Sequence, residues 1–199
     1  VYQAMNTFQQ AVTCFVGQNI GARKPRRVLS SMYVSLFWAL SFGVVFGVLT
    51  PDGRVDVQRT AALVAEAGPM QTTFHRAFDM ACDLEEALEA AVAAGCRRIL
   101  TSGGRNTAVE GIDTLRALVA QAAGRIELMA GSGVNPSNVR QLAATGVDAV
   151  HFSARSVRPG GMVFRNPHVS MGDCGDVSEY DLLCADERLI RQILTLLEP

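Results

Sequence analysis

Lysine is almost missing from this sequence of 199 residues, and acidic residues are missing from its first quarter. Lys24 is the sole lysine, so the chain after residue 44 has no lysine to form a Schiff base with a carbonyl substrate. No Asp or Glu precedes Asp52, whereas residues 52–199 hold 14 arginines and 19 acidic residues. The chain therefore joins two segments of different composition.

Several functional motifs are missing as well. The five cysteines form no C-x-x-C pair, which argues against a structural zinc site and a disulfide framework and favours a reducing compartment. No G-x-G-x-x-G or Walker sequence follows an apolar run, so a nucleotide cofactor is unsupported. The formal net charge of -1 gives no excess of positive charge that would favour binding of a nucleic acid. With 49% hydrophobic and 19% charged residues, the composition is typical of a folded protein.

One uncharged run is long enough to raise the question of a membrane. Residues 28–51 contain 24 residues without a formal charge, and a bilayer core needs about 20 apolar residues. The basic cluster at residues 23–27 precedes the run, as in membrane proteins that keep positive charges inside. The alternative is an amphipathic helix followed by a buried strand. We expect a cytoplasmic protein or, alternatively, one that associates with a membrane through residues 28–51.

From residue 44 onward, strand-like and helix-like segments alternate. Apolar runs of strand length occupy residues 44–50, 70–78, 97–103, 126–133 and 148–154. Helix-like stretches are expected at about 56–67, 83–94, 107–121, 136–144 and 179–197. Residues suited to helix N-caps are Asp56, Asp83, Thr107 and Asn135, and glycines suited to helix ends are Gly68, Gly95, Gly124 and Gly146.

This alternation predicts an α/β fold with a parallel sheet. The expected architecture is a partial TIM (β/α) barrel of about five βα units, preceded by an apolar helical segment. A closed barrel needs eight strands, and a five-stranded arc has two open edges, so we expect the folded chain to form homo-oligomers.

Small and hydroxyl residues follow the last two strand runs, where a parallel sheet gathers its ligands. Their backbone N–H groups, and a helix expected near Pro136, are suited to bind an anion such as phosphate. The alternative is that the glycines only form tight turns. The candidate anion-binding residues are Gly131, Ser132, Gly133, Ser153 and Ala154.

A second group of candidates follows the earlier strand runs. Arg76 is suited to clamp a carboxylate or phosphate and His75 to act as an acid or base, or else Arg76 pairs with Asp79 and merely fixes the loop. His151 is either catalytic or a core histidine. The tip formed by residues 101–103 supplies further candidate ligand groups, namely Thr101, Ser102 and Gly103.

Five short motifs in order resemble the CutC-type copper homeostasis family. They are FGVLTPDGRVD (46–56), TFHRAFDM (73–80), RILTSGG (98–104), LMAGSGV (128–134) and VHFSAR (150–155). The resemblance implies a cytoplasmic TIM-like barrel with a role in copper homeostasis and copper binding. It also implies that the matched positions line the pocket, namely His75, Arg76, Asp79, Thr101, Ser102, Gly131, Gly133, His151 and Ser153. The family's first three βα units, with the cysteines proposed as copper ligands, have no counterpart here. Copper is therefore implied by the resemblance alone, and the metal ligands are unknown.

The start of the chain resembles a different family. NTFQQAVTCFVGQNIGARKPRRV (6–28) is similar to part of a MATE-type multidrug efflux transporter. We therefore divide the chain into residues 1–43, a helical segment that associates with a membrane in one interpretation, and residues 44–199, a truncated CutC-like barrel. Two other functions remain open: an inactive membrane-tethered remnant of a transporter fusion, and a barrel enzyme acting on a small phosphorylated or carboxylated substrate.

Overall fold

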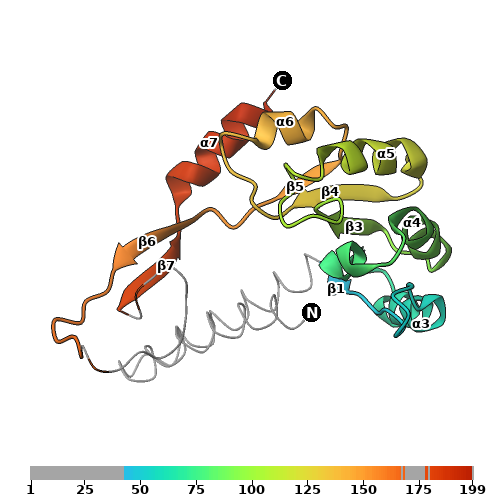
Figure 1. Cartoon of the computed structure of the whole chain (residues 1–199), viewed down its shortest axis with the longest axis horizontal. Coiled ribbons are helices and arrows are strands. Elements are labelled where there is room, and N and C mark those ends of the chain that lie inside the picture. The colour runs from blue at the N-terminus through green and yellow to red at the C-terminus, as the bar shows by residue number, and fades with distance from the viewer. Residues whose placement is uncertain (1–42, 167, 169–177, 179, 199) are drawn as a thin grey trace.

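A five-stranded parallel sheet forms the centre of the fold (Figure 1). The computed structural model describes residues 43–166, 168, 178 and 180–198. The strands lie side by side in chain order and are β1 (Val44–Phe46), β2 (Thr72–Phe74), β3 (Arg98–Thr101), β4 (Glu127–Gly131) and β5 (Ala149–His151). The predicted α/β fold with five parallel strands is confirmed. Each strand is shorter than its apolar run, because the last residues of the run leave the sheet to form the loop that follows.

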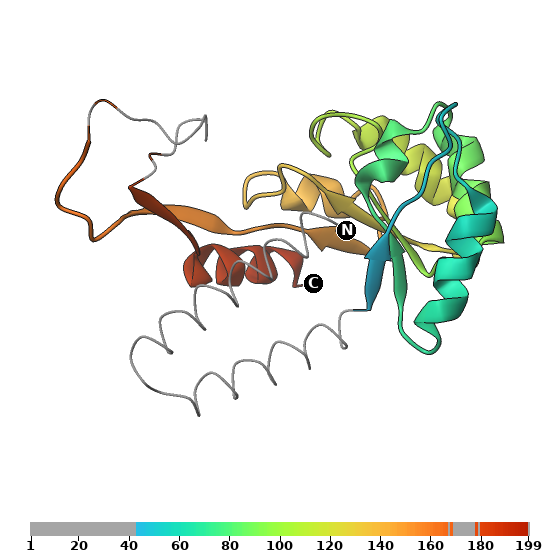
Figure 2. The ribbon, with the colours of Figure 1, turned by 90° about the horizontal axis from the view of Figure 1, so that it is seen from below.

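Four α-helices pack along one face of this sheet (Figure 2). They are α3 (Val57–Ala67), α4 (Leu84–Ala93), α5 (Ile112–Ala122) and α6 (Val139–Ala143). A short 3-10 helix, η1 (Arg76–Met80), follows β2 directly. A helix in each connection returns the chain to the same end of the sheet, so the strand pairs are all parallel.

The predicted caps of α3 and α4 are confirmed. The Asp56 carboxylate accepts a 3.0 Å hydrogen bond from the Arg59 N–H. The Asp83 carboxylate accepts from the N–H groups of Glu85 and Glu86 at 2.9 and 3.0 Å. These bonds satisfy N–H groups that have no partner within the helix. The four glycines expected at the helix ends adopt positive φ angles, as predicted: Gly68, Gly95, Gly124 and Gly146.

The predicted caps of α5 and α6 are wrong. The Thr107 hydroxyl accepts only a long 3.4 Å bond from the Glu110 N–H, and α5 begins later, at Ile112. Asn135 accepts from the Ser137 N–H at 2.9 Å, which closes a turn before α6 rather than starting it. In both loops the side chain caps an isolated turn, so the sequence pattern of a cap is present without the helix.

The register of the sheet places four apolar side chains in one buried row. The row consists of Phe46, Phe74, Ile99 and Leu128, one from each of β1 to β4. It packs against buried leucines of the helices, including Leu88 of α4 and Leu118 of α5. Full burial of one such side chain contributes about 1.5–3 kcal/mol, so this row contributes a large part of the stability of the sheet.

The opposite face of the sheet carries an ion pair. The Arg98 guanidinium donates to the Glu127 carboxylate at 2.5 and 2.8 Å, and the two side chains are 26% and 28% exposed. In a closed barrel this face would form the interior. Among the described residues, β1 and β5 have no further strand beside them.

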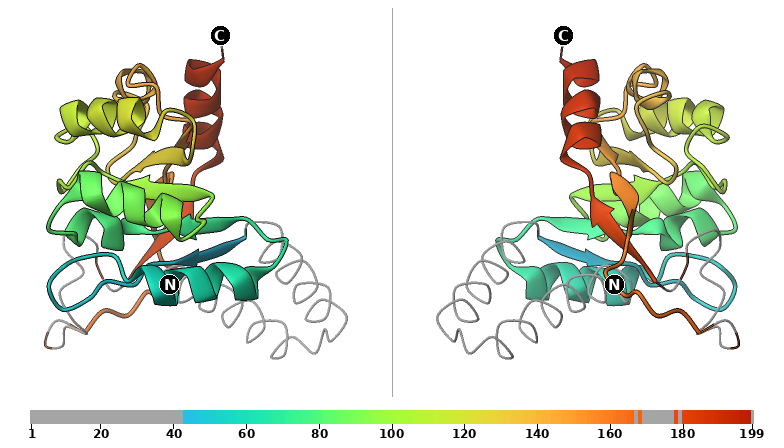
Figure 3. Two further views of the ribbon diagram at one scale, coloured as in Figure 1. Left: turned by 90° about the vertical axis from the view of Figure 1, so that its right-hand side faces the viewer. Right: turned by 90° about the vertical axis from the view of Figure 1, so that its left-hand side faces the viewer.

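An antiparallel ribbon extends away from the sheet (Figures 1 and 3). It pairs β6 (Arg155–Pro159) with β7 (Asp181–Ala185), and α7 (Glu187–Leu197) follows and packs against α6. The single helix predicted over 179–197 is therefore wrong in its first third. Residues 181–185 pair with β6 instead, and the helix begins where the Asp186 carboxylate accepts from the Arg188 N–H at 2.9 Å.

The segment predicted to be helical at residues 1–43 lies, apart from Gly43, outside the described residues. The same holds for residues 28–42 of the uncharged run. The described remainder of that run contains β1 and no helix. Within the described part of the chain, no helix is both long and apolar enough to cross a membrane.

Candidate functional site

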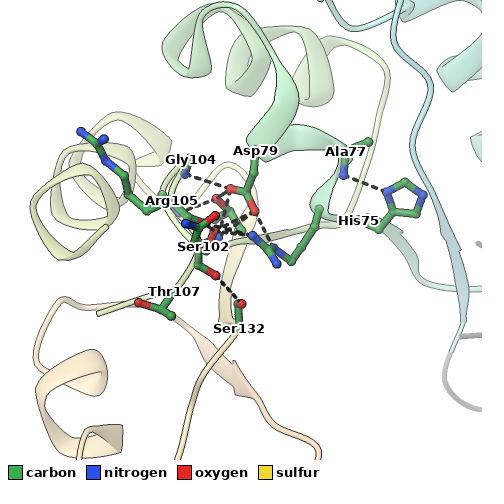
Figure 4. A network of polar contacts seen from close by, with 12 residues as sticks. His75, Ala77, Asp79, Ser102, Gly104, Arg105, Thr107 and Ser132 are labelled. Atoms are coloured by element: carbon green, nitrogen blue, oxygen red, sulfur yellow. Dashed lines mark hydrogen bonds and ion pairs between the residues drawn. The ribbon is translucent and has the colours of Figure 1, made fainter. Parts of the chain in front are cut away.

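The carboxyl ends of β2, β3 and β4 lie together at one end of the sheet, as the parallel topology requires (Figure 4). The residues that follow these strands form a network of polar contacts. Its centre is Asp79 of η1, whose side chain is 5% exposed. The buried carboxylate needs partners, and these come from β3 and from the loop after it.

The Asp79 carboxylate accepts hydrogen bonds from three residues at the end of β3. The Thr101 hydroxyl donates at 2.6 Å, and the Ser102 N–H and the Gly104 N–H donate at 3.0 Å each. The Ser102 hydroxyl also lies 3.0 Å from this carboxylate. Thr101 and Ser102 are residues that we predicted to bind an external anion, and the third candidate of this tip, Gly103, donates its N–H to the Thr101 hydroxyl at 2.9 Å. In the structure the protein's own carboxylate occupies the donors of Thr101 and Ser102.

Arg76 completes the network. Its Nε donates to the Asp79 carboxylate at 2.8 Å, while its Nη2 donates to the Ser102 hydroxyl at 2.8 Å and to the Arg105 carbonyl at 3.1 Å. The ion pair with Asp79 is one of the two alternatives that we left open. This ion pair leaves part of the Arg76 guanidinium free to bind a ligand, since Nη1 has no acceptor among the described residues and the side chain is 41% exposed.

His75 lies apart from this network, although it is adjacent to Arg76 in sequence (Figure 4). Its Nδ1 accepts a 3.0 Å hydrogen bond from the Ala77 N–H. The ring packs so closely on Gly47 that a Cβ added there would meet ring atoms at 2.7 Å. Burial lowers the pKa of His75, so the ring is neutral at pH 7. Its predicted catalytic role stays a prediction.

The end of β4 is connected to the same loop. The Ser132 hydroxyl donates to the Asn106 carbonyl at 2.6 Å, and the Ser132 carbonyl accepts from the Ala108 N–H at 3.0 Å. Ser132 has a φ of 85° and Gly133 a φ of 72°. Within the described residues, neither of their N–H groups meets an acceptor. Both residues keep some exposure to solvent.

The end of β5 lies beside the end of β4. His151 pairs in register with Gly131 and is exposed to solvent, although partial burial of its ring lowers its pKa, and both interpretations of this residue stay predictions. Ser153 is exposed, and Ala154 has a φ of 42° while its carbonyl accepts from the Asp186 N–H at 2.7 Å. Apart from His75, the predicted residues thus form two groups, one around Asp79 and one at the ends of β4 and β5.

The loop between β3 and α5 joins these groups, and the sequence analysis singled out its start, Ser102 and Gly103, but not Arg105 and Asn106. Arg76 donates to the carbonyl of Arg105, and Ser132 donates to the carbonyl of the next residue, Asn106. Both contacts use backbone acceptors, which any residue type provides. The sequence signal for this loop is the glycine pair that follows Ser102, of which Gly103 was a candidate, and both glycines adopt a φ of 70°.

A metal site is not assembled by the described residues, which contain no group of three His, Cys, Asp or Glu side chains suited to hold a metal ion. The cysteines in this part of the chain lie apart: Cys82 is exposed, Cys96 is buried and Cys184 is half-buried. Burial raises the pKa of the Cys96 thiol to about 11, which disfavours the thiolate that binds metals.

Comparison with known proteins agrees with this fold. Residues 38–156, more than half of the chain, match the CutC family. The chain belongs to the CutC family. A CutC-family protein from Xylella fastidiosa strain 9a5c is 46% identical over 156 residues, which is 78% of this chain and 56% of that protein. One from Porphyromonas gingivalis strain ATCC 33277 is 45% identical over 157 residues, 78% of this chain and 63% of that protein.

A solved CutC structure shares the fold. The candidate copper homeostasis protein CutC from Streptococcus agalactiae superposes with a TM-score of 0.53 and 31% identity, covering 63% of this chain and 62% of that one. The resemblance to CutC is thereby confirmed. The chain spans 56% and 63% of the two curated relatives named above. The transporter resemblance of residues 1–43 and the domain boundary stay predictions.

Proposed function

We propose that this CutC-family chain contributes to copper homeostasis, and that its own chemistry is the binding of a small phosphate or carboxylate anion at the ends of β4 and β5. The first part follows the name of the Streptococcus agalactiae relative. The second part rests on the N–H groups of Ser132 and Gly133, which meet no acceptor among the described residues. Anions commonly bind at this end of a parallel sheet, where backbone N–H groups converge.

The backbone at Ser132 supports this proposal. A φ of 85° is strained for a residue with a side chain, and such strain costs on the order of 1–3 kcal/mol. The two bonds of Ser132 to the loop hold it in this conformation. Residues held in this way concentrate at binding sites, and here the result is that two adjacent N–H groups remain available to one ligand.

Copper itself does not fit the described residues. Copper(I) prefers thiolate, thioether and imidazole ligands, and no set of three metal-binding side chains lies together in this part of the chain. The copper binding implied by the resemblance is therefore not assigned to these residues. In the proposal the backbone N–H groups hold the anion, the Ser153 hydroxyl donates a further hydrogen bond, and no step passes through copper.

Association of copies of the chain is a further part of the proposal. Both outer strands of the described sheet, β1 and β5, lack a neighbour, and unpaired strand edges favour association. Light scattering coupled to gel filtration measures the mass in solution. A species of twice the mass of 21.3 kDa or more is expected, and a monomer would contradict this part.

The anion site is tested by titration with inorganic phosphate. We expect saturable stabilisation of the wild-type chain, about 1.4 kcal/mol at ten times the Kd. Gly133→Asp should abolish it, because it adds a negative charge beside the N–H groups. Gly124→Asp controls for the added charge and the positive φ, since Gly124 has a φ of 74°, and Gly133→Ala controls for the contact of a Cβ at Gly133 with Thr107 at 3.2 Å. Absence of stabilisation in the wild type, or full stabilisation of Gly133→Asp, would refute the proposal.

A further inference from the structure

We infer that the ligand of this site carries two anionic groups, and that Arg76 binds the second one. The inference rests on the proposed function, in which the first anionic group binds the N–H groups of Ser132 and Gly133. It adds a second recognition point on the other side of the loop between β3 and α5. The chemical class is a short phosphocarboxylate, with the two charged ends joined by a few carbon atoms.

The guanidinium of Arg76 is fixed along one edge and free at the other. Nε and Nη2 are bound to Asp79, Ser102 and the Arg105 carbonyl at 2.8–3.1 Å. Nη1 carries two further N–H donors, and no described residue accepts from them. An arginine held in this way loses little side-chain entropy when it binds a carboxylate, so the free donors are preorganised for an anion.

The charge of Arg76 is not cancelled by Asp79. The carboxylate also accepts from two backbone N–H groups and from the hydroxyl of Thr101. Its negative charge is therefore shared among several donors, each of which stabilises it. The guanidinium retains positive charge, and 41% of the side chain is exposed to solvent.

The loop sets the spacing between the two recognition points. Arg76 and Ser132 donate to the carbonyls of adjacent residues, Arg105 and Asn106, at 3.1 and 2.6 Å. Since consecutive Cα atoms are about 3.8 Å apart, Nη2 of Arg76 and Oγ of Ser132 lie within about 11 Å of each other. A ligand atom sits about 3 Å from each donor. Nη1 and the Ser132 N–H lie about 2–3 Å from Nη2 and Oγ, so the two anionic groups of a ligand that lies between them are at most roughly 10 Å apart, and the ligand must be short.

Three probes separate this inference from the proposed function. Isothermal titration calorimetry is carried out with inorganic phosphate, glycerol 3-phosphate and 3-phosphoglycerate, which differ in the second anionic group. We expect 3-phosphoglycerate to bind the wild type about tenfold more tightly than glycerol 3-phosphate, from one charge-assisted hydrogen bond. If phosphate binds and this preference is absent, the inference fails while the proposed function stands. If phosphate does not bind, the proposed function fails.

The variant Arg76→Gln tests whether Arg76 binds the second anionic group. This variant should lose the tenfold preference and keep its affinity for phosphate, whereas loss of all three affinities would indicate a merely structural role and overturn the inference. Arg105→Gln is the matched control, because its side chain points away from the network and only its carbonyl takes part (Figure 4). It removes the same charge from the same region and should keep the preference.

A labelling experiment on the wild type covers the case in which Arg76→Gln does not fold. Phenylglyoxal modifies exposed guanidinium groups, and peptide mass spectrometry reports the modification at Arg76. We expect 3-phosphoglycerate to protect Arg76 and glycerol 3-phosphate to leave it reactive at equal site occupancy. Equal labelling with both probes would overturn the inference.

Discussion

Replacement of Asp79 by Asn tests whether this carboxylate holds the ends of β2 and β3 together. The side chain is 5% exposed and accepts from Arg76, Thr101, Ser102 and Gly104. The amide keeps one oxygen, but its NH2 group faces donors that no longer have an acceptor. Removing one partner of a buried pair costs about 3–5 kcal/mol. Because Arg76 is 41% exposed and partly solvated, the lower end of this range applies, about 3 kcal/mol.

Urea unfolding of the wild type and of Asp79→Asn, monitored by circular dichroism, measures the difference in the free energy of unfolding. Calorimetry of the same two proteins measures the difference in Tm. For a domain of this size each kcal/mol shifts Tm by roughly 2–4 °C, so the expected decrease is about 6–12 °C. Asp113→Asn is the control, because the Asp113 side chain is 98% exposed in its pair with Arg116 and should not change stability measurably. If Asp79→Asn unfolds within about 0.5 kcal/mol of the wild type, the network is not a structural brace.

Two further predictions concern titratable groups. Hydrogen bonds from Arg125 and Gln121 lower the pKa of Glu89 to about 2, so its contribution to stability is present above its ordinary pKa of 4.5 and is lost as the pH falls toward 2. The acid-unfolding curve of Glu89→Gln should therefore be flatter than that of the wild type between these values, and superimposable curves would contradict the prediction. Cys96 is buried and its pKa is raised to about 11, whereas Cys82 is exposed. Iodoacetamide at pH 8 should label Cys82 much faster than Cys96 by peptide mass spectrometry, and equal rates would show that Cys96 is accessible.

The sequence predicted the strands and the helix boundaries best where the signals are local. The caps at Asp56 and Asp83 act within three residues of their own position. The glycines at the helix ends need only a positive φ. In contrast, residues 181–185 share helical spacing with α7, and they form β7 because β6 lies opposite them. Pairing over such a separation is not visible in the spacing of one segment.

The candidate site shows the same limit. The pairing of Arg76 with Asp79, three residues apart, was one of two alternatives at the sequence level. The bonds from Asp79 to Thr101 and Gly104 connect residues 22 and 25 positions apart. They became visible only when the topology placed β2 and β3 side by side. A motif therefore indicated residues that lie close together in the fold, while the question of whether their donors are free or occupied required the fold itself.

The loop from Ser102 to Ala108 makes the ends of three strands mechanically interdependent. It is held by η1 through Asp79 and Arg76, and by β4 through Ser132. If the loop detaches from η1, the carbonyl of Asn106 is no longer held near Ser132. If it detaches from β4, the carbonyl of Arg105 is no longer held near Arg76. Such a segment opens as one cooperative unit rather than by fraying residue by residue. A ligand that binds at the end of β4 would then slow amide hydrogen exchange at the end of β3, without contacting it.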